Sequence, residues 1–129
     1  MRDRVAQARV GRLATVTGDG APHVVPCCFV LDADTIYSAV DAKPKSTLAL
    51  RRLDNIRAHP LASLVVDHYS NDWNELWWVR VDGAARIVES EAEHRAALAA
   101  LTEKYRQYVT HRPPGPVIAI DITSWRAWP

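Results

Sequence analysis

A succession of short apolar segments joined by tight turns constrains the fold of this chain most. The first turn, Gly18-Asp19-Gly20, separates the strand-like run 12–17 from the apolar run 23–31 and is typical of a β-hairpin. The turn Asp32-Ala33-Asp34 then leads into a third strand, 35–40. Strands joined by such short turns pair with their sequence neighbours, so the pattern predicts a mostly antiparallel sheet.

The remaining segments alternate between helical and strand-like patterns. Helices are expected over 3–10, from the N-cap Ser46 to about Ala58, and after the capping box Ser90-Glu-Ala-Glu93, where Leu98, Leu101, Tyr105 and Tyr108 recur at helical spacing. Further strands are expected over 61–68, over 75–88 with a break near Asp82-Gly83, and over 117–122 ahead of the tail 124–128. Six strands with a helix after the third and another after the fifth predict an α+β, mainly β, antiparallel barrel. Neither a βαβ alternation nor a Gly-x-Gly-x-x-Gly motif is present, which argues against a Rossmann domain.

The size and net charge of the chain indicate how many domains it forms and which kinds of partner it is not expected to bind. A chain of 129 residues, 48% of them hydrophobic, is expected to form one domain over 1–129. The formal net charge of +1 predicts neither a nucleic-acid partner nor a membrane-surface protein. Residues 1–10 lack an apolar run, so a cytoplasmic location is expected. No metal site is expected, because the histidines and the two cysteines lack zinc-ligand spacing.

The segment Lys43-Pro44-Lys45-Ser46-Thr47 stands at the start of an expected helix and is followed by Arg51. A helix N-terminus offers free N–H groups and partial positive charge, and lysines and hydroxyls beside it would complete a phosphate site. The alternative is a solvated loop whose lysines only decorate the surface.

Aromatic side chains are concentrated in the segment 73–80, which holds three of the five tryptophans. On a strand Trp77 and Trp78 face opposite sides, so one can line a cavity while the other packs in the core, and Arg80 shares the face of Trp78. The alternative is that these tryptophans only supply packing area. Trp125 and Trp128 carry the same ambiguity.

No set of side chains is arranged for nucleophilic catalysis. A cysteine in the apolar run, Cys27 or Cys28, would have a raised pKa if buried, and the adjacent pair is not expected to form a disulfide. His23 is interpreted as a structural or ligand-contacting histidine. Catalytic residues therefore remain unassigned, which is typical of an enzyme whose cofactor carries the chemistry.

Six segments together resemble one family. They are Arg12-Leu-Ala-Thr-Val, Gly20-Ala-Pro-His-Val-Val-Pro, Val40-Asp-Ala-Lys-Pro-Lys, Asn55-Ile-Arg-Ala-His-Pro60, Leu64-Val-Val-Asp-His-Tyr69 and Trp77-Trp-Val-Arg-Val-Asp-Gly83. This succession covers nearly the whole chain and resembles the pyridoxamine 5′-phosphate oxidase-like superfamily, which has the FMN-binding split β-barrel fold. Within that superfamily the chain looks most like the actinobacterial enzymes that use coenzyme F-420, an 8-hydroxy-5-deazaflavin.

The resemblance implies a homodimer with two cofactor sites between the subunits. Lys43, Lys45, Ser46 and Arg51 would lie near the cofactor phosphate. Val25, Pro26, Ser38, Ala39 and Val40 would flank the ring, and Trp77, Trp78, Arg80, Trp125 and Trp128 would come from the partner or close the mouth. A hydride would then pass between F-420 and a small unsaturated or quinone-like substrate.

Two alternatives stay open at this stage. The first is an FMN-dependent oxidoreductase or oxidase, since a phosphate site does not separate FMN from F-420. The second is a non-catalytic flavin or haem binder, in which His23 or His68 would have to act as the axial ligand of a haem. The five tryptophans and the apolar run 23–31 also favour a homodimer, because they exceed what one small barrel can cover.

Overall fold

The computed structural model describes residues 1–40 and 47–129, with side chains for all of these except residues 47–50. The strands are β1 (Gly11–Val16), β2 (Pro22–Cys27), β3 (Val30–Asp32), β4 (Thr35–Ala39), β5 (Leu61–His68), β6 (Trp77–Ile87) and β7 (Val117–Trp128). The helices are α1 (Arg2–Gln7), α2 (Thr47–Ala58), α3 (Glu91–Lys104), α4 (Gln107–Thr110) and the 3-10 turn η1 (Trp73–Glu75). No helix in the described part of the chain is long and apolar enough to span a bilayer.

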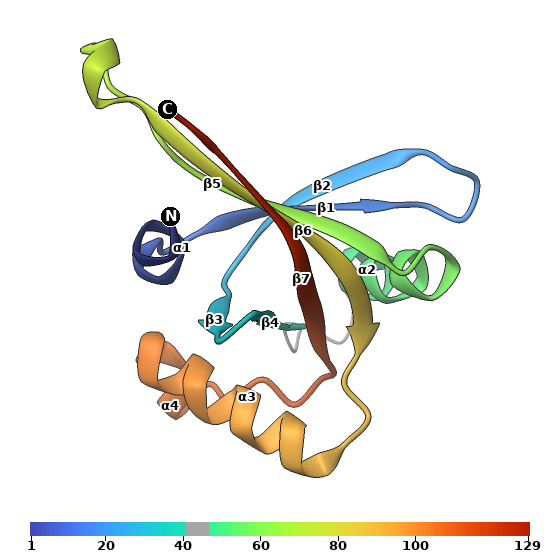
Figure 1. Cartoon of the computed structure of the whole chain (residues 1–129). Coiled ribbons are helices and arrows are strands. Elements are labelled where there is room, and N and C mark those ends of the chain that lie inside the picture. The colour runs from blue at the N-terminus through green and yellow to red at the C-terminus, as the bar shows by residue number, and fades with distance from the viewer. Residues whose placement is uncertain (41–46) are drawn as a thin grey trace.

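All seven strands form one antiparallel sheet in the order β2-β1-β5-β6-β7-β4-β3, which curls into a half-barrel (Figure 1). The prediction of six strands was wrong, because the apolar run 23–31 supplies two. β2 pairs with β1 at one end of the sheet, whereas β3 pairs with β4 at the other. Phe29 lies between them, and its backbone N–H donates to the Tyr105 hydroxyl at 3.1 Å. The unbroken apolar pattern of residues 23–31 therefore gave no sign that the pairing partner changes from β1 to β4 within this run.

The longest strands, β6 and β7, pair along their whole length and project beyond the barrel together with β5 (Figure 1). Their register shifts between Asp82 and Gly83, which confirms the predicted break. Thr123 is the extra residue on β7 at this bulge, and its hydroxyl donates to the Asp82 carbonyl at 3.2 Å. The expected tail 124–128 is not a tail, because beyond the bulge it continues β7 along the first half of β6.

The core has two parts. The concave face of the sheet buries Leu13, Leu64, Val81 and Phe29, and α2 covers it with Leu53 and Ile56. A second cluster lies where α3 packs Leu98 and Leu101 against Val117. The capping interaction is present, since the Ser90 hydroxyl accepts the Glu93 N–H at 3.3 Å.

The third helix ends earlier than its apolar spacing predicts. α3 stops at Lys104, Tyr105 is its C-cap, and Tyr108 lies on α4. The Tyr105 backbone is extended, and its hydroxyl bonds to both Phe29 backbone groups and to the Arg9 carbonyl.

Two predictions about the second strand are confirmed. Pro26 lies on β2, an edge strand of the sheet, where its missing N–H breaks no ladder. Cys27 is buried and Cys28 is exposed, and both are free thiols.

Candidate functional site

The face of the sheet that points away from the core carries rows of side chains running across strands. One row reads Pro26, Arg12, Val65, Arg80 and Arg126 from β2 through β1, β5 and β6 to β7, as the pairing register places each opposite the next. This outer face alternates strictly with the buried face, so its composition follows from strand periodicity.

The next row along the outer face holds Asp67, Trp78 and Trp128, and it borders a pocket of about 590 Å³. The pocket is lined by Arg12, Val65, Asp67, His68, Tyr69, Leu76, Trp77, Trp78 and Trp128. Its lining is mostly aromatic and apolar, and Arg12 and Asp67 form an ion pair of 3.1 Å at its wall. Such a pocket suits a flat, largely apolar molecule with a polar edge.

The two adjacent tryptophans of β6 face opposite sides, as predicted. Trp78 is paired with Trp128 on the outer face, whereas Trp77 packs against the core. The Arg4 guanidinium lies over the Trp77 ring at 4.7 Å from its centroid, and His68 stacks on it at 6.2 Å. Trp77 thus fills the wall of the pocket while Trp78 and Trp128 present their rings to it.

The predicted ring-flanking residues lie at the ends of β2 and β4. Ser38 is buried and its hydroxyl donates to the Cys28 carbonyl at 2.8 Å. Ala39 and Val40 are buried, and the Val40 N–H donates to the Pro116 carbonyl at 3.0 Å. Val25 packs against the core and Pro26 is exposed. β4 continues past its last partner on β3, which leaves that part of its edge unpaired by β3.

The predicted phosphate site falls mostly outside the described residues. Lys43, Lys45 and Ser46 lie in the segment that the structure does not describe. Arg51 is exposed on α2, and its neighbour Arg52 is half-buried. Burial raises the pKa of the Cys27 thiol, as predicted, and the positive charge of Arg52 is among the effects that oppose it.

The candidate residues form two groups in one chain. Val25, Pro26 and 38–40 lie at the strand edges that precede α2, whereas Trp78, Arg80 and Trp128 share the outer face of β6 and β7. Trp125 belongs to neither group, because it packs on the core with the Arg2 guanidinium 5.3 Å from its ring centroid. Sequence reasoning missed Arg12, Asp67 and Arg126, whose place in the rows follows only from the register between strands.

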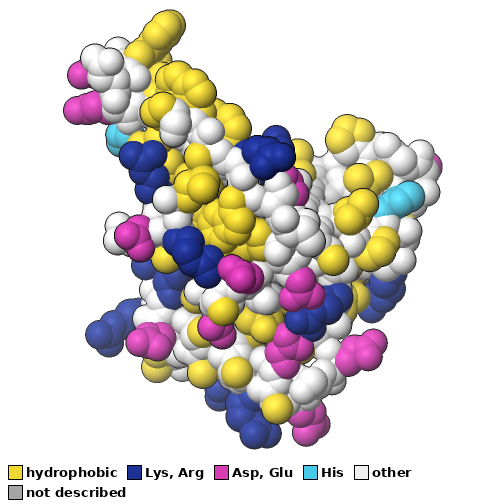
Figure 2. All heavy atoms as spheres, in the orientation of Figure 1, with side chains coloured by type: hydrophobic (Ala, Val, Ile, Leu, Met, Phe, Trp, Pro, Cys, Tyr) yellow, Lys and Arg dark blue, Asp and Glu magenta, His cyan; other side chains and the backbone are white. Residues whose placement is uncertain are grey.

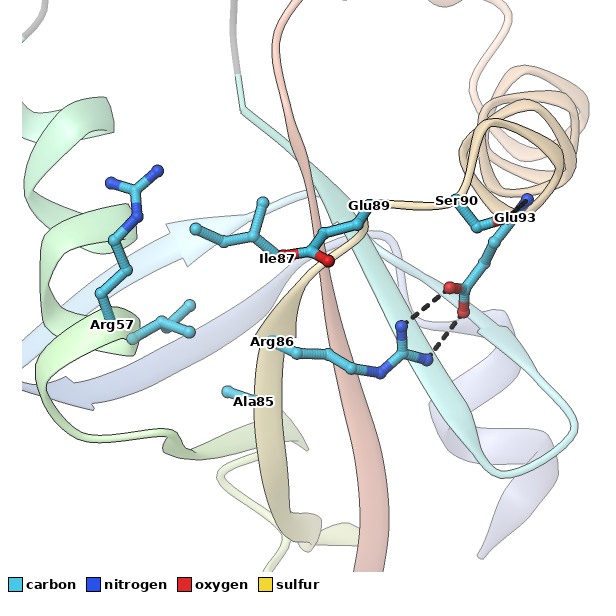
Figure 3. A pocket seen from close by; sticks show the side chains of 8 residues that line it. Arg57, Ala85, Arg86, Ile87, Glu89, Ser90 and Glu93 are labelled. Atoms are coloured by element: carbon cyan, nitrogen blue, oxygen red, sulfur yellow. Dashed lines mark hydrogen bonds and ion pairs between the residues drawn. The ribbon is translucent and has the colours of Figure 1, made fainter.

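A separate pocket of about 670 Å³ lies between α2, β6 and the start of α3 (Figure 3). Its polar wall is the Arg86 guanidinium, which donates to Glu93 at 2.8 and 2.7 Å and to Asp121 at 2.7 and 3.2 Å. The Tyr37 hydroxyl donates to the same Glu93 carboxylate at 2.7 Å. These groups satisfy one another, so the wall has a structural role and offers few free polar groups to a ligand.

The pKa values around this network follow from its hydrogen bonds. The Arg86 guanidinium and then the Tyr37 hydroxyl lower the pKa of Glu93 to about 2. Burial, with the Glu93 hydrogen bond, raises the pKa of Tyr37 to about 12. Among the described residues no group of three or more His, Cys, Asp or Glu side chains could hold a metal ion.

The curled antiparallel sheet with its helices defines the class of protein, the α+β split-barrel proteins. The sequence pattern of the pyridoxamine 5′-phosphate oxidase family matches residues 1–129. The chain therefore belongs to that family.

Solved structures agree on the fold. A conserved hypothetical protein of Mycobacterium tuberculosis has a TM-score of 0.78 and 22% identity, covering 98% of this chain and 80% of that one. An FAD-binding protein of Mesorhizobium loti has a TM-score of 0.74 and 22% identity, covering 98% and 89%. A haem-binding protein of Mycobacterium smegmatis has a TM-score of 0.78 and 21% identity, and this chain spans 51% of its length. No curated protein matches the sequence significantly.

Proposed function

We propose that the chain is a cytoplasmic, homodimeric oxidoreductase that uses the deazaflavin coenzyme F-420 to transfer a hydride to or from a small unsaturated or quinone-like substrate. The family match places the chain among the split-barrel proteins of the pyridoxamine 5′-phosphate oxidase family. The choice of F-420 rests on the sequence resemblance described above.

One observation supports the shared site more than any other: the two groups of candidate residues lie on different parts of a single chain. The β2 and β4 edges precede α2, whereas Trp78 and Trp128 belong to the protruding ends of β6 and β7. A second copy packed on the outer face would bring one chain's strand edges to the other chain's tryptophans. The outer face also exposes large apolar side chains, Val24 at 61%, Leu61 at 65% and Trp128 at 47%.

The space-filling view supports a covered outer face. Figure 2 shows hydrophobic side chains along the protruding β5 to β7 region and over the β1–β2 hairpin, with basic side chains beside them. Strands at one end of the sheet, β2 and β1, and strands in its middle, β5 to β7, thus carry apolar surface that one barrel leaves in water. Burial of this surface between two copies would be favourable by roughly 25 cal/mol for each Å² of apolar area removed from water.

The residues present fit a flavin-type ring system. Its carbonyl and N–H edge needs backbone partners, which the unpaired part of β4 and the edge strand β2 can offer, and its flat faces need apolar contacts such as Val25 and Pro26. A bound deazaflavin supplies a hydride at one ring carbon. The chain's own groups would hold the cofactor, orient the acceptor against it and exclude water.

FMN in the same position is the second candidate. The similarity of the fold to an FAD-binding protein favours it, and a phosphate held near Lys43 and Lys45 would be common to both cofactors. A haem reading needs an axial ligand. Replacing His23 and, separately, His68 by alanine tests this candidate: haem binding unchanged in both variants would rule these two histidines out as the axial ligand.

The deciding experiment is a parallel titration of the apo-protein with F-420 and with FMN, followed by quenching of tryptophan fluorescence. Tight binding of F-420 with weak binding of FMN supports the proposal. Preference for FMN would make the chain a conventional flavoenzyme, and binding of neither cofactor would refute the proposed activity.

The phosphate site is tested by the double variant Lys43→Ala, Lys45→Ala. We expect it to weaken F-420 binding by about 3 kcal/mol, the scale of lost charge-assisted hydrogen bonds. Arg95→Ala, at an exposed position on α3, is the matched control that also removes a positive charge. Equal affinity in the double variant and the control would rule the phosphate site out.

The dimer is tested by light scattering of Val24→Asp beside Val109→Asp. Both valines are about equally exposed, at 61% and 65%, but Val24 lies on the outer face of β2 and Val109 on α4. We expect Val24→Asp to give a monomer and Val109→Asp to leave the dimer intact. A monomeric wild-type protein at micromolar concentration would contradict the shared site.

A further inference from the structure

Two arginines stand directly opposite each other on the outer face. Arg80 of β6 is the cross-strand partner of Arg126 of β7. Side chains in such a pair have Cβ atoms about 4.5–5.5 Å apart, and like charges at that separation destabilise a sheet. An ion pair between Arg80 and Asp82 offsets part of this cost, and an anion bound between the two arginines would offset the rest.

The neighbouring carboxylates do not neutralise the pair. Arg80 Nε forms an ion pair with Asp82 at 2.9 Å, and Arg12 forms one with Asp67 at 3.1 Å. Arg126 has no carboxylate partner within the described part of the chain; its guanidinium donates to the Trp125 carbonyl at 3.2 Å. Three arginines against two aspartates leave one positive charge in excess at this place.

The positive charge of Arg126 helps to lower the pKa of Asp82. Burial acts to raise the pKa of Asp82, but hydrogen bonds from Ser63 and Arg80 and the charges of Arg80 and Arg126 bring it below its ordinary value. Asp82 is already held by Ser63 at 2.5 Å and by Arg80. Both contacts are made by Oδ1 of Asp82, and Arg126 forms no ion pair with this carboxylate in the described part of the chain.

The arginine pair lies one row away from two tryptophans of the aromatic pocket. The pair Trp78 and Trp128 is two residues along the same strands, which corresponds to about 7 Å on the same face. Both tryptophans line the pocket of about 590 Å³. A flat molecule resting on the tryptophan pair can thus place a carboxylate substituent over the arginine pair.

We propose that Arg80 and Arg126 bind the carboxylate of a flat, unsaturated substrate whose ring or double bond lies against Trp78 and Trp128. The observation behind it is the juxtaposition of a like-charge arginine pair, one member without a carboxylate partner, with an aromatic pocket. Its reading as a substrate site rests on the proposed function, because the hydride acceptor would lie between the tryptophan pair and the cofactor ring. Arg126 would then be a specificity-determining residue for acidic acceptors.

The test uses a probe that needs no cofactor. The full-length apo-protein is titrated with 2-naphthoate and with 2-naphthamide, which has the same ring system without the charge, and tryptophan fluorescence is followed. We expect the acid to bind at least about 10-fold more tightly than the amide. Equal affinities would overturn the proposal, because the arginine pair would then contribute nothing.

Variants separate the arginine pair from the aromatic pocket. Arg126→Gln should weaken 2-naphthoate binding about 10-fold and leave 2-naphthamide binding unchanged, and Arg126→Lys should keep part of the affinity. Arg95→Gln, on the exposed face of α3, should change neither affinity. Unchanged 2-naphthoate binding in Arg126→Gln would refute the assignment. Circular dichroism checks that each variant is folded.

Two further outcomes separate this proposal from others. If wild-type protein does not bind 2-naphthoate and Arg126→Gln turns a dimer into a monomer, the pair serves carboxylates of the second copy and the proposal is wrong. If 2-naphthoate binds as expected but neither F-420 nor FMN does, the anion site stands and the proposed oxidoreductase function fails.

Discussion

Arg86 ties four elements together, and its replacement by methionine keeps most of the side-chain length while removing the charge. The guanidinium of this β6 residue makes two hydrogen bonds to Glu93 of α3 (Figure 3). It makes two more to Asp121 of β7. The Tyr37 hydroxyl of β4 reaches the same Glu93 carboxylate. Arg86→Met leaves the carboxylates of Glu93 and Asp121 without their common partner, whereas Tyr37 keeps its hydrogen bond to Glu93.

The size of the effect follows from the number of bonds and their exposure. A hydrogen bond to a charged group contributes about 1.5–3 kcal/mol net, and four of them would exceed the whole expected effect if fully buried. The side chains are 41% exposed at Arg86, 26% at Glu93 and 46% at Asp121, so water screens the pairs and can solvate the carboxylates left behind. We therefore expect the free energy of unfolding to fall by about 2 kcal/mol at pH 7.

The pH dependence gives a second, independent check. Because the Arg86 guanidinium, followed by the Tyr37 hydroxyl, lowers the pKa of Glu93 from 4.5 to about 2, the unfolded state takes up a proton first as the pH falls. The stabilisation by Arg86 is full above pH 4.5 and is lost as the pH falls toward 2. Urea unfolding of both proteins at pH 7 and pH 3 should show a smaller difference at pH 3. A difference below about 0.5 kcal/mol at pH 7, or an equal one at both pH values, would refute the reasoning.

Three further changes have definite expected results in thermal unfolding. Gly83→Ala should cost about 3 kcal/mol, because the added Cβ would lie 2.2 Å from the Asp121 carbonyl oxygen. Tyr105→Phe should cost about 2 kcal/mol, because it leaves the buried Phe29 N–H without its acceptor. Lys104→Met should raise Tm at pH 7: burial, then Arg9, lowers the pKa of this buried amine to about 8, so its penalty is full below pH 8 and disappears as the pH rises toward 10.5.

A different result would refute each of these three predictions. Gly18→Ala is the control for the first, since its Cβ would meet only the Ala58 methyl at 4.0 Å, and an equal loss in both glycine variants would remove the steric explanation. A neutral Tyr105→Phe would mean that water replaces the hydroxyl. A Lys104→Met variant less stable at pH 7 would mean that contacts of the amine with the Phe29 ring, 4.0 Å away, outweigh its burial.

Local sequence patterns were sufficient to predict most of the helices and strands. The turn Gly18-Asp19-Gly20 predicted the β1–β2 hairpin, and the capping box predicted the start of α3. The strand 61–68 was predicted with the bounds that β5 has. These features depend on residues close in sequence, where turn chemistry and periodicity act directly.

The errors share one cause, which is pairing with residues far away in sequence. Nothing within the apolar run 23–31 shows that its first part pairs with β1 and its last part with β4. The segment 124–128 looks like a tail until β6 is known to extend beside it. The candidate site could not be predicted for the same reason. Arg12 lies near Asp67, and Arg80 beside Arg126, only because of the register between the strands.

The protruding ends of β5, β6 and β7 explain both the site and the uncovered outer face. Beyond the bulge at Asp82 and Gly83 these strands leave the barrel, so no helix of the described chain covers the face that carries Trp78 and Trp128 (Figure 1). The same departure makes room for the pocket beside them. A barrel that closed over this face would bury the tryptophans and the arginine pair at the cost of unpaired charge. The pocket and the uncovered face therefore have one structural origin, and a variant that fills the pocket should also alter the surface offered to a second copy.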